Sequence, residues 1–236
     1  MINRLPNQFT ADCTKKEVIF GWIYLVIHIF VLPLALAFAE PYLPFSMTEA
    51  QANLLYYGIS LTVVLLVFWK LLRREFDHML DHPILCMKGF LFGNLIWYGL
   101  SVVMTLIMLA FGLNMDSPND QSIDAMADTA YNVTAAISVF FAPILEEILF
   151  RGVAFQSLRK KNRILAYAVS MGLFAIYHVW QYALVFQDPS YLLYALQYLP
   201  ITFAITWSYE YSGSLWTAIL FHMSNNYLAL TIMQLT

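Results

Sequence analysis

Charged side chains are scarce in this sequence. They make up 11% of its 236 residues, while hydrophobic residues make up 61%. Soluble domains carry about 25% charged residues, so this composition excludes a water-soluble fold. It indicates a polytopic membrane protein with no separate soluble domain. The sequence also lacks a basic stripe interleaved with aromatic residues, so nucleic acid is not an expected partner.

Cysteines are equally few, with only Cys13 and Cys86 in the chain. They lie far apart in the sequence, and both fall on the predicted inner side of the membrane. A disulfide framework is therefore not expected. A thiol nucleophile is disfavoured for the same pair, because nothing in the sequence arranges either cysteine with a histidine.

Long apolar runs are abundant, and a run of about 20 residues suffices to cross a bilayer as a helix. Seven such runs occur, at roughly Val18–Ala39, Ala52–Trp69, Ile84–Leu113, Val133–Leu158, Ile164–Phe186, Tyr191–Ser208 and Leu215–Leu235. We therefore predict an all-α bundle of about seven transmembrane helices. Residues 1–236 form one membrane domain, in which 1–130 supply three accessory spans and an acidic loop, and 131–236 supply a motif-bearing core.

Charge separates sharply between the two sides of the predicted membrane. Basic residues cluster on one side, at Arg4, Lys15, Lys16, Lys70, Arg73, Arg74, Arg159, Lys160, Lys161 and Arg163. The connecting segments on the other side carry Glu40, Glu49, Asp116, Asp120, Asp124, Asp128 and Asp188. The positive-inside rule then places the N-terminus in the cytoplasm and the C-terminus outside. The acidic link 114–131 is expected to be a solvated loop, since it lacks the ligand spacing of a calcium loop.

Polar residues interrupt three of the spans at a common depth. Counted from the basic side at 1.5 Å per residue, Glu146, His178 and Asn226 each lie about 20 Å deep. His222 lies one helical turn nearer that side. Ionisable groups are costly in hydrocarbon and usually mark a site, so we expect these side chains to surround one pocket.

Helical periodicity assigns directions to these side chains. Glu147 and Arg151 are four residues apart and can form an ion pair within one helix, whereas Glu146 points about 100° away. His222 and Asn226 are also four apart and project together. Pro143 removes a backbone donor, so we expect a local kink that opens a pocket beside Glu146. We expect this cavity to open toward the basic side.

The same residues form three motifs. Glu146-Glu147-Ile-Leu-Phe-Arg151 matches EExxxR, Phe174-Ala-Ile-Tyr-His178 matches FxxxH, and His222-Met-Ser-Asn-Asn226 matches HxxxN. In this order and spacing, the chain resembles the CPBP family, the CAAX proteases and bacteriocin-processing enzymes that include the Rce1-type prenyl-protein endopeptidases. The resemblance runs from about Ala135 to Asn226 and leaves the first three spans unmatched.

The resemblance implies an intramembrane endopeptidase. Glu146 and His178 would hold and deprotonate a water, and His222 and Asn226 would contact the oxyanion of the tetrahedral intermediate. Glu147 and Arg151 would form a supporting ion pair. No cofactor is favoured, and zinc held by Glu146, His178 and His222 is the alternative, because two imidazoles and a carboxylate can bind that metal.

The expected substrate is a peptide or protein tail in or at the membrane, either prenylated or a small peptide, and the expected location is the plasma membrane of a bacterium. Two other functions stay open. Buried carboxylates and histidines also build proton relays, so a proton-coupled transporter is one alternative. A catalytically idle membrane scaffold of the same family is the other. His78 and His82 are read as part of a solvated amphipathic segment rather than as metal ligands.

Overall fold

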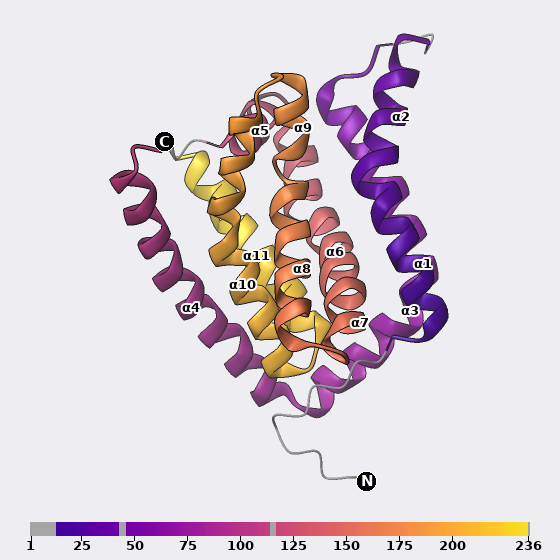
Figure 1. Cartoon of the computed structure of the whole chain (residues 1–236). Coiled ribbons are helices and arrows are strands. Elements are labelled where there is room, and N and C mark those ends of the chain that lie inside the picture. Colours follow the sequence, from indigo (N-terminus) through magenta and orange to yellow (C-terminus); the bar gives the residue numbers. More distant parts are fainter. Residues whose placement is uncertain (1–12, 43–45, 114–116, 236) are drawn as a thin grey trace.

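The computed structural model describes residues 13–42, 46–113 and 117–235, and these residues form helices and no strand (Figure 1). The first half contains α1 (Lys15–Val26), η1 (Ile27–Val31), α2 (Leu32–Ala39), η2 (Glu40–Tyr42), α3 (Glu49–Asp81) and α4 (Pro83–Ala110). The second half contains α5 (Pro118–Ala135), η3 (Ala136–Phe141), α6 (Ala142–Glu146), η4 (Glu147–Phe155), α7 (Gln156–Arg159), α8 (Arg163–Tyr177), α9 (Trp180–Val185), η5 (Pro189–Tyr194), α10 (Ala195–Ser212) and α11 (Leu215–Met233). The predicted all-α bundle is confirmed.

Side-chain caps fix where the long helices begin. Thr14 and Thr48 each accept a hydrogen bond from the third residue of the following helix, and that residue's side chain reaches back to the cap. Ser117 caps α5 by accepting from the Asp120 N–H. Such caps satisfy N–H groups that have no partner in the first helical turn.

Four helical stretches have the length and hydropathy of a membrane span. They are Lys15–Ala39, Glu49–Asp81, Pro83–Ala110 and Pro118–Arg159. Arg163–Tyr177 is apolar but shorter. The protein is therefore an integral membrane protein, while the count of seven spans stays a prediction.

Two sequence-based boundaries are wrong. The link predicted as a solvated loop is helical from Pro118 onward, and its Asp-rich stretch belongs to α5. The second span does not end at Trp69 but continues as α3 to Asp81. The helix can continue because Glu75, which is 1% exposed, is hydrogen-bonded inside the bundle. Its carboxylate accepts from the Gln156 side chain and from the Leu215 N–H. A carboxylate with such partners can remain inside a helix bundle.

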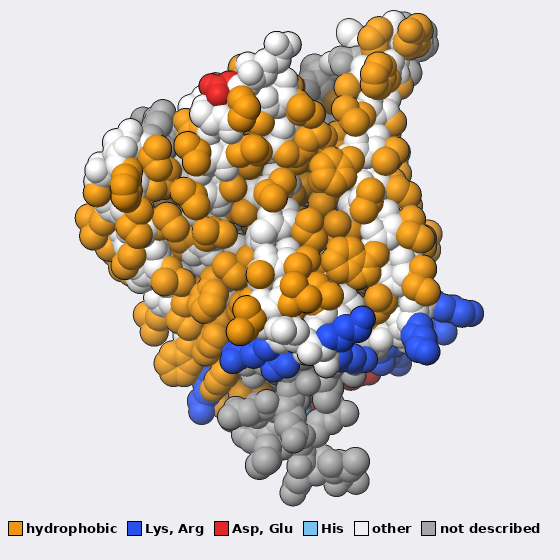
Figure 2. Space-filling model, viewed as in Figure 1, with side chains coloured by type: hydrophobic (Ala, Val, Ile, Leu, Met, Phe, Trp, Pro, Cys, Tyr) orange, Lys and Arg blue, Asp and Glu red, His pale blue; other side chains and the backbone are white. Residues whose placement is uncertain are grey.

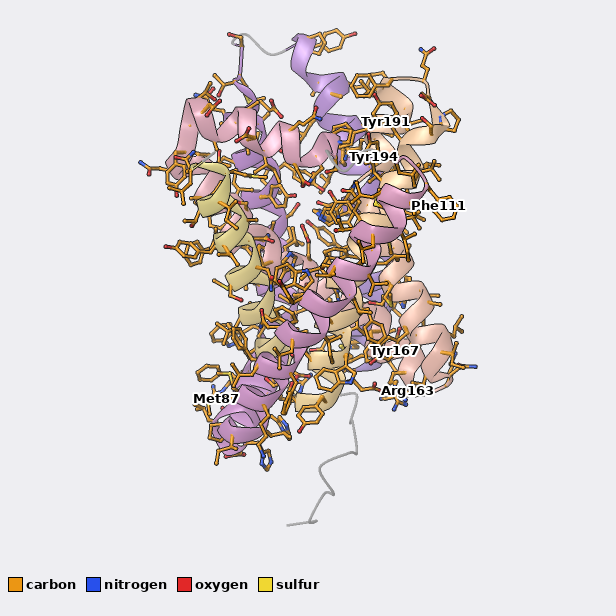
Figure 3. The ribbon with its side chains drawn as sticks, turned by 90° about the vertical axis from the view of Figure 1, so that its left-hand side faces the viewer. Met87, Phe111, Arg163, Tyr167, Tyr191 and Tyr194 are labelled. Atoms are coloured by element: carbon orange, nitrogen blue, oxygen red, sulfur yellow. The ribbon has the colours of Figure 1, made fainter. Side chains whose placement is uncertain are left out.

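The two ends of the bundle differ in charge, as predicted. Lysines and arginines gather along one edge of the molecule, which we call the basic face (Figure 2). Arg163 lies toward this face, whereas Phe111, Tyr191 and Tyr194 lie toward the opposite end (Figure 3). Glu49, Asp120, Asp124, Asp128 and Asp188 lie on segments at that opposite end, which we call the acidic face (Figure 1).

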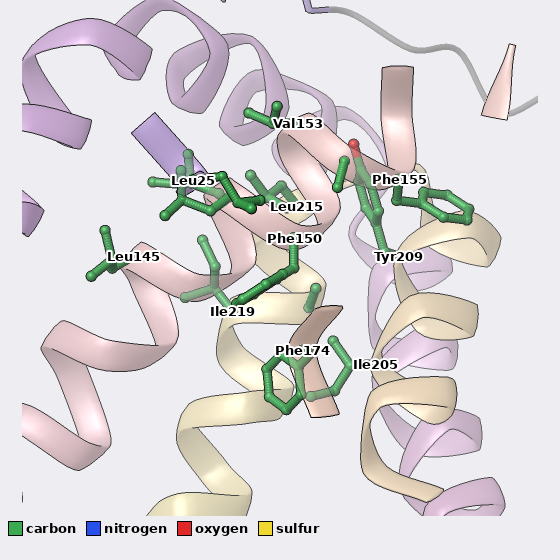
Figure 4. Close-up of a cluster of buried hydrophobic side chains, with 14 of the residues drawn as sticks. Leu25, Leu145, Phe150, Val153, Phe155, Phe174, Ile205, Tyr209, Leu215 and Ile219 are labelled. Carbon is green, nitrogen blue, oxygen red and sulfur yellow. The ribbon is translucent and has the colours of Figure 1, made fainter. Parts of the chain in front are cut away.

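The core lies around η4, which is buried along its whole length. Phe150, Val153 and Phe155 of η4 pack with Ile205 and other fully buried side chains of α1, α10 and α11 (Figure 4). This packed layer fills the half of the bundle nearer the basic face. The polar side chains that are predicted to surround one pocket lie beyond this layer.

Two glycines let α4 approach α10 and α11. A β-carbon on Gly89 would lie 3.2 Å from the Ser208 carbonyl oxygen, and one on Gly93 would lie 2.9 Å from a ring carbon of Phe221. Ser208 also donates a hydrogen bond to the Gly89 carbonyl over 2.8 Å. Small residues four apart are the usual means of close helix packing in membranes.

Gly93→Val should therefore weaken the contact between α4 and the core, because the new side chain meets Phe221 and Ser208. We expect a loss of thermal stability of about 1–3 kcal/mol, the usual cost of overpacking. Gly99→Val is the matched control, because nothing lies within 4 Å of a β-carbon there. Thermal unfolding in detergent would measure both. Equal midpoints for the two variants would contradict the packing role of Gly93.

Candidate active site

Glu146 and Glu147 lie in one continuous helix that changes its winding around Pro143. The short α-helical segment α6 is flanked by the π-helical segments η3 and η4. The residues on both sides of Pro143 remain helical. The wider π-helical turns accommodate the loss of the backbone hydrogen bond that proline cannot donate. π-helical winding flanks Pro143 on both sides and is itself a cause of helix kinks, so the kink beside Glu146 stays a prediction. The residue with non-helical dihedrals is Ala130.

Glu147 and Arg151 form the predicted ion pair, with Nη1 and Oε1 2.9 Å apart and both side chains 0% exposed. Arg151 also donates from Nη2 to the Thr202 hydroxyl over 2.6 Å and from Nε to the Thr206 hydroxyl over 3.3 Å. Its guanidinium lies 4.6 Å from the centre of the Phe174 ring. A buried charge is tolerated only when it is paired and hydrogen-bonded, and Arg151 meets this condition.

His222 joins this pair from α11. Its Nδ1 lies 2.8 Å from the Glu147 oxygen that Arg151 also contacts. A carboxylate accepts, so Nδ1 carries the proton and donates it, and Nε2 is left for the cavity. The sequence analysis predicts the Glu147–Arg151 pair and His222 as separate features. In the structure they form one hydrogen-bonded chain.

His178 faces Glu146 across a gap. Helix α8 ends at Tyr177, and His178 follows as its C-cap. Its Nδ1 donates to the Phe174 carbonyl over 2.8 Å, and its Nε2 lies 3.9 Å from Oε2 of Glu146. That distance is too long for a direct hydrogen bond, but a water can bridge it. Oε2 of Glu146 is buried and has no hydrogen-bond partner.

Asn226 is held from a third direction. Its Nδ2 donates to the Ser138 carbonyl of η3 over 2.8 Å. One cavity of about 430 Å³ is lined by Glu146, His178, His222 and Asn226. The structure thus brings all four predicted site residues to one pocket, and it places Glu147 and Arg151 directly behind His222.

The cavity opens in the direction opposite to the one expected. Its lining continues from the four site residues to Glu49 on α3, Asp120 on α5 and Met233 on α11, which all lie at the acidic face. The expectation that it opens toward the basic face is wrong. The reason is steric, because the packed core around η4 fills the space between Glu146 and the basic face.

A tyrosine cluster beside the site was not recognised from the sequence. Tyr177 contacts both Tyr57 and His28, with oxygen–oxygen and oxygen–Nε2 distances of 3.2 and 3.1 Å. Tyr56 donates to the His28 carbonyl over 2.9 Å. Tyr56, Tyr57 and Tyr177 all line the cavity. Three tyrosines in apolar spans read as packing, and only the fold shows that their hydroxyl groups meet.

Two threonines on α10 were missed as well. Thr202 and Thr206 are four residues apart and both serve Arg151. Their spacing puts them on one face of a helix, which is the only signal the sequence carried. No pattern in the sequence matches that helix face to Arg151.

The side chains that could bind zinc do not lie together as a zinc site requires. Among the residues that the structure describes, no three His, Cys, Asp or Glu side chains form a group that could hold a metal ion. His78 has a different partner, since its Nε2 lies 3.0 Å from the Ser212 carbonyl.

The cysteines are free and buried. The Cys13 thiol contacts the Gly152 carbonyl at 3.0 Å, and burial raises its pKa to about 12. A thiol with so high a pKa is a poor nucleophile near neutral pH.

Comparison with known proteins agrees with this site. Residues 129–228 match the family described as "Type II CAAX prenyl endopeptidase Rce1-like". A search of curated proteins and a search of solved structures each found no match. The matched segment contains EExxxR, FxxxH and HxxxN, so it confirms the relationship predicted from these motifs. The match, which covers 100 of the 236 residues, supports the CAAX-protease (CPBP) family and, in general terms, an intramembrane protease with peptide or prenylated-protein substrates at the membrane.

Removing Arg151 should destabilise the protein severely. Arg151→Met leaves the Glu147 carboxylate buried without its charge partner, which costs about 3–5 kcal/mol in comparable cases. The double variant Glu147→Gln/Arg151→Met should recover part of this loss because it removes both charges. Thermal unfolding in detergent would measure the difference.

Arg163→Met is the control for that experiment. Arg163 pairs with Glu210 over 2.8 Å, but its side chain is 61% exposed. Exposed pairs contribute about 0–1 kcal/mol. A melting temperature for Arg151→Met no lower than for Arg163→Met would contradict the role assigned to the buried pair.

Proposed function

We propose that the protein is an endopeptidase that hydrolyses peptide bonds with a water activated by Glu146 and His178. The observation that carries this proposal is the buried, unpartnered Oε2 of Glu146, which faces Nε2 of His178 over 3.9 Å inside a cavity. The gap suits one bridging water. A free carboxylate oxygen and a free imidazole nitrogen can orient that water and take its proton.

The reaction proceeds in two steps with balanced proton transfer. As the water oxygen bonds to the carbonyl carbon, Glu146 takes a proton, and a tetrahedral oxyanion forms. Asn226 donates to this oxyanion through its amide, and His222 donates through Nε2 in its doubly protonated form, whose charge the Glu147 carboxylate balances. The Glu147 carboxylate supports His222 by accepting from Nδ1, in the way a buried carboxylate holds a catalytic imidazole. When the carbon–nitrogen bond breaks, the proton on Glu146 passes to the leaving nitrogen, and the carboxylate is restored.

The proposed substrates are peptides or protein tails in or at the membrane, in the plasma membrane of a bacterium. A prenylated tail and a small peptide both fit the cavity lining, which combines aromatic and aliphatic side chains with polar groups. The substrate must lie extended at the scissile bond, because a helix keeps its carbonyl groups in internal hydrogen bonds.

The proton-coupled transporter is the weaker alternative. A carrier needs a path that reaches both faces of the membrane, at least alternately. The side chains from Glu147 to Gln156 are buried without interruption between the cavity and the basic face. The idle scaffold is separated from the enzyme only by an activity measurement.

Glu146→Gln should abolish cleavage, because an amide cannot accept the water's proton. His178→Ala should lower it strongly as well. We expect losses in kcat of at least about 10²-fold, the usual contribution of a positioned general base. The assay is purified protein in detergent with a quenched fluorescent lipidated peptide. Asp77→Asn, at an exposed carboxylate, is the control and should retain activity. Full activity in Glu146→Gln would reject the mechanism.

Metal dependence needs its own measurement. We expect activity to survive incubation with a strong chelator, because the mechanism uses a water held by Glu146 and His178 alone. Loss of activity with the chelator and its return on addition of zinc would contradict this expectation. It would instead support the ligand set Glu146, His178 and His222.

A further inference from the structure

The substrate's route to the site is set by which end of the cavity reaches the surface. Glu49, Gln181 and Ala229 line the cavity and are exposed. Gln181 belongs to α9, which lies at the acidic end with α5 (Figure 1). Along α11, Ala229 lies seven residues beyond His222 toward the acidic face, or about 10 Å at the helical rise. The cavity therefore leads from the site to the acidic face.

The opposite direction is closed by a thick layer of protein. The residues from Glu147 to Gln156 span about 15 Å of helix and are all buried. Gln156 donates to Glu75 over 2.9 Å, and Tyr209 donates to the same carboxylate over 3.3 Å. This polar layer joins α3, α7 and α10 beneath the apolar core. A peptide cannot pass it from the basic face.

The mouth of the cavity is negatively charged. Glu49 and Asp120 both line it, and no lysine or arginine is among the described residues of the lining. The Ser122 hydroxyl donates to Glu49 over 2.8 Å, which ties the start of α3 to α5 and holds this carboxylate at the rim. A cleft lined by one sign of charge attracts ligands of the opposite sign.

We propose that the site is reached from the acidic face, which the positive-inside rule places outside the cytoplasm, and that it selects cationic peptide segments there. This inference rests on the proposed endopeptidase function. The substrate class is therefore a peptide or membrane-protein segment with lysine or arginine beside the scissile bond. The carboxylates at the rim attract the basic residue of the substrate, and the scissile bond then lies at the buried site beyond them.

Two quenched peptides of equal hydrophobicity test the charge preference, one flanked by lysine and one by glutamate. The wild type should cleave the lysine peptide with the higher kcat/KM. In Glu49→Gln/Asp120→Asn this advantage should fall by about tenfold at low salt, a typical size for electrostatic guidance, and salt should reduce it in the wild type. Asp128→Asn is the matched control, because Asp128 lies exposed on α5 and does not line the cavity.

Binding separates this inference from the proposed reaction. Glu146→Gln should bind the lysine peptide more tightly than the glutamate peptide, as measured by fluorescence anisotropy. Cleavage that depends on Glu146 but shows no charge preference would overturn the inference and leave the endopeptidase standing. If neither peptide is cleaved but the binding preference remains, the endopeptidase proposal is overturned and the charge preference stands. Equal losses for both peptides in the double variant would also overturn the charge selection.

Sidedness is measured in sealed, right-side-out vesicles. Lysine peptide added outside should be cleaved without permeabilisation, and a membrane-impermeant maleimide should label Asp124→Cys but not Lys160→Cys. Both substituted positions are exposed, and they lie at the acidic and basic faces. Cleavage that appears only after permeabilisation, or the reverse labelling pattern, would overturn access from the outer face.

Discussion

One guanidinium buried at the depth of the membrane organises the site. Arg151 is 0% exposed, and its charge is balanced by Glu147 and its donors by Thr202 and Thr206. Glu147 in turn accepts from His222, so the Glu147–Arg151 pair connects η4, α10 and α11. An arginine in this position is costly unless every donor is used. The same constraint that keeps Arg151 satisfied therefore holds His222 at the wall of the cavity.

The two proposed reactive groups, Glu146 and His178, lie where the helices depart from regular α-geometry. Glu146 lies at the junction of α6 and the π-helical η4, and His178 follows the last residue of α8. π turns occur often at functional sites because the extra residue re-aims the side chains around it. Here Glu146 faces His178 while its neighbour Glu147 faces Arg151. Two adjacent carboxylates thus serve different partners, one left available for a water and the other held in a salt bridge.

Sequence reasoning succeeded where the information was local. The Glu147–Arg151 pair follows from a spacing of four, and the shared cavity of Glu146, His178, His222 and Asn226 follows from equal depth in three apolar runs. It failed where the answer depended on packing between distant segments. The Asp-rich stretch after Pro118 has little hydrophobicity, so it read as a loop, yet Ser117 caps it and Met126 buries against its neighbours. The direction of the cavity failed for the same reason, because no local pattern reveals that η4 is buried on every side.

The close seam at Gly89 and Gly93 has a consequence for how the protein sits in lipid. Helix α4 has 28 residues and is about 42 Å long, which exceeds the roughly 30 Å of a bilayer's hydrocarbon core. In Figure 1 it lies at one edge of the bundle and slants away from the other helices, and the two glycines hold it against them near its start. A helix that is too long accommodates the mismatch by tilting, and the tilt is set by packing against neighbouring helices. The close contacts at Gly89 and Gly93 therefore set the inclination at which α4 fits the hydrocarbon layer.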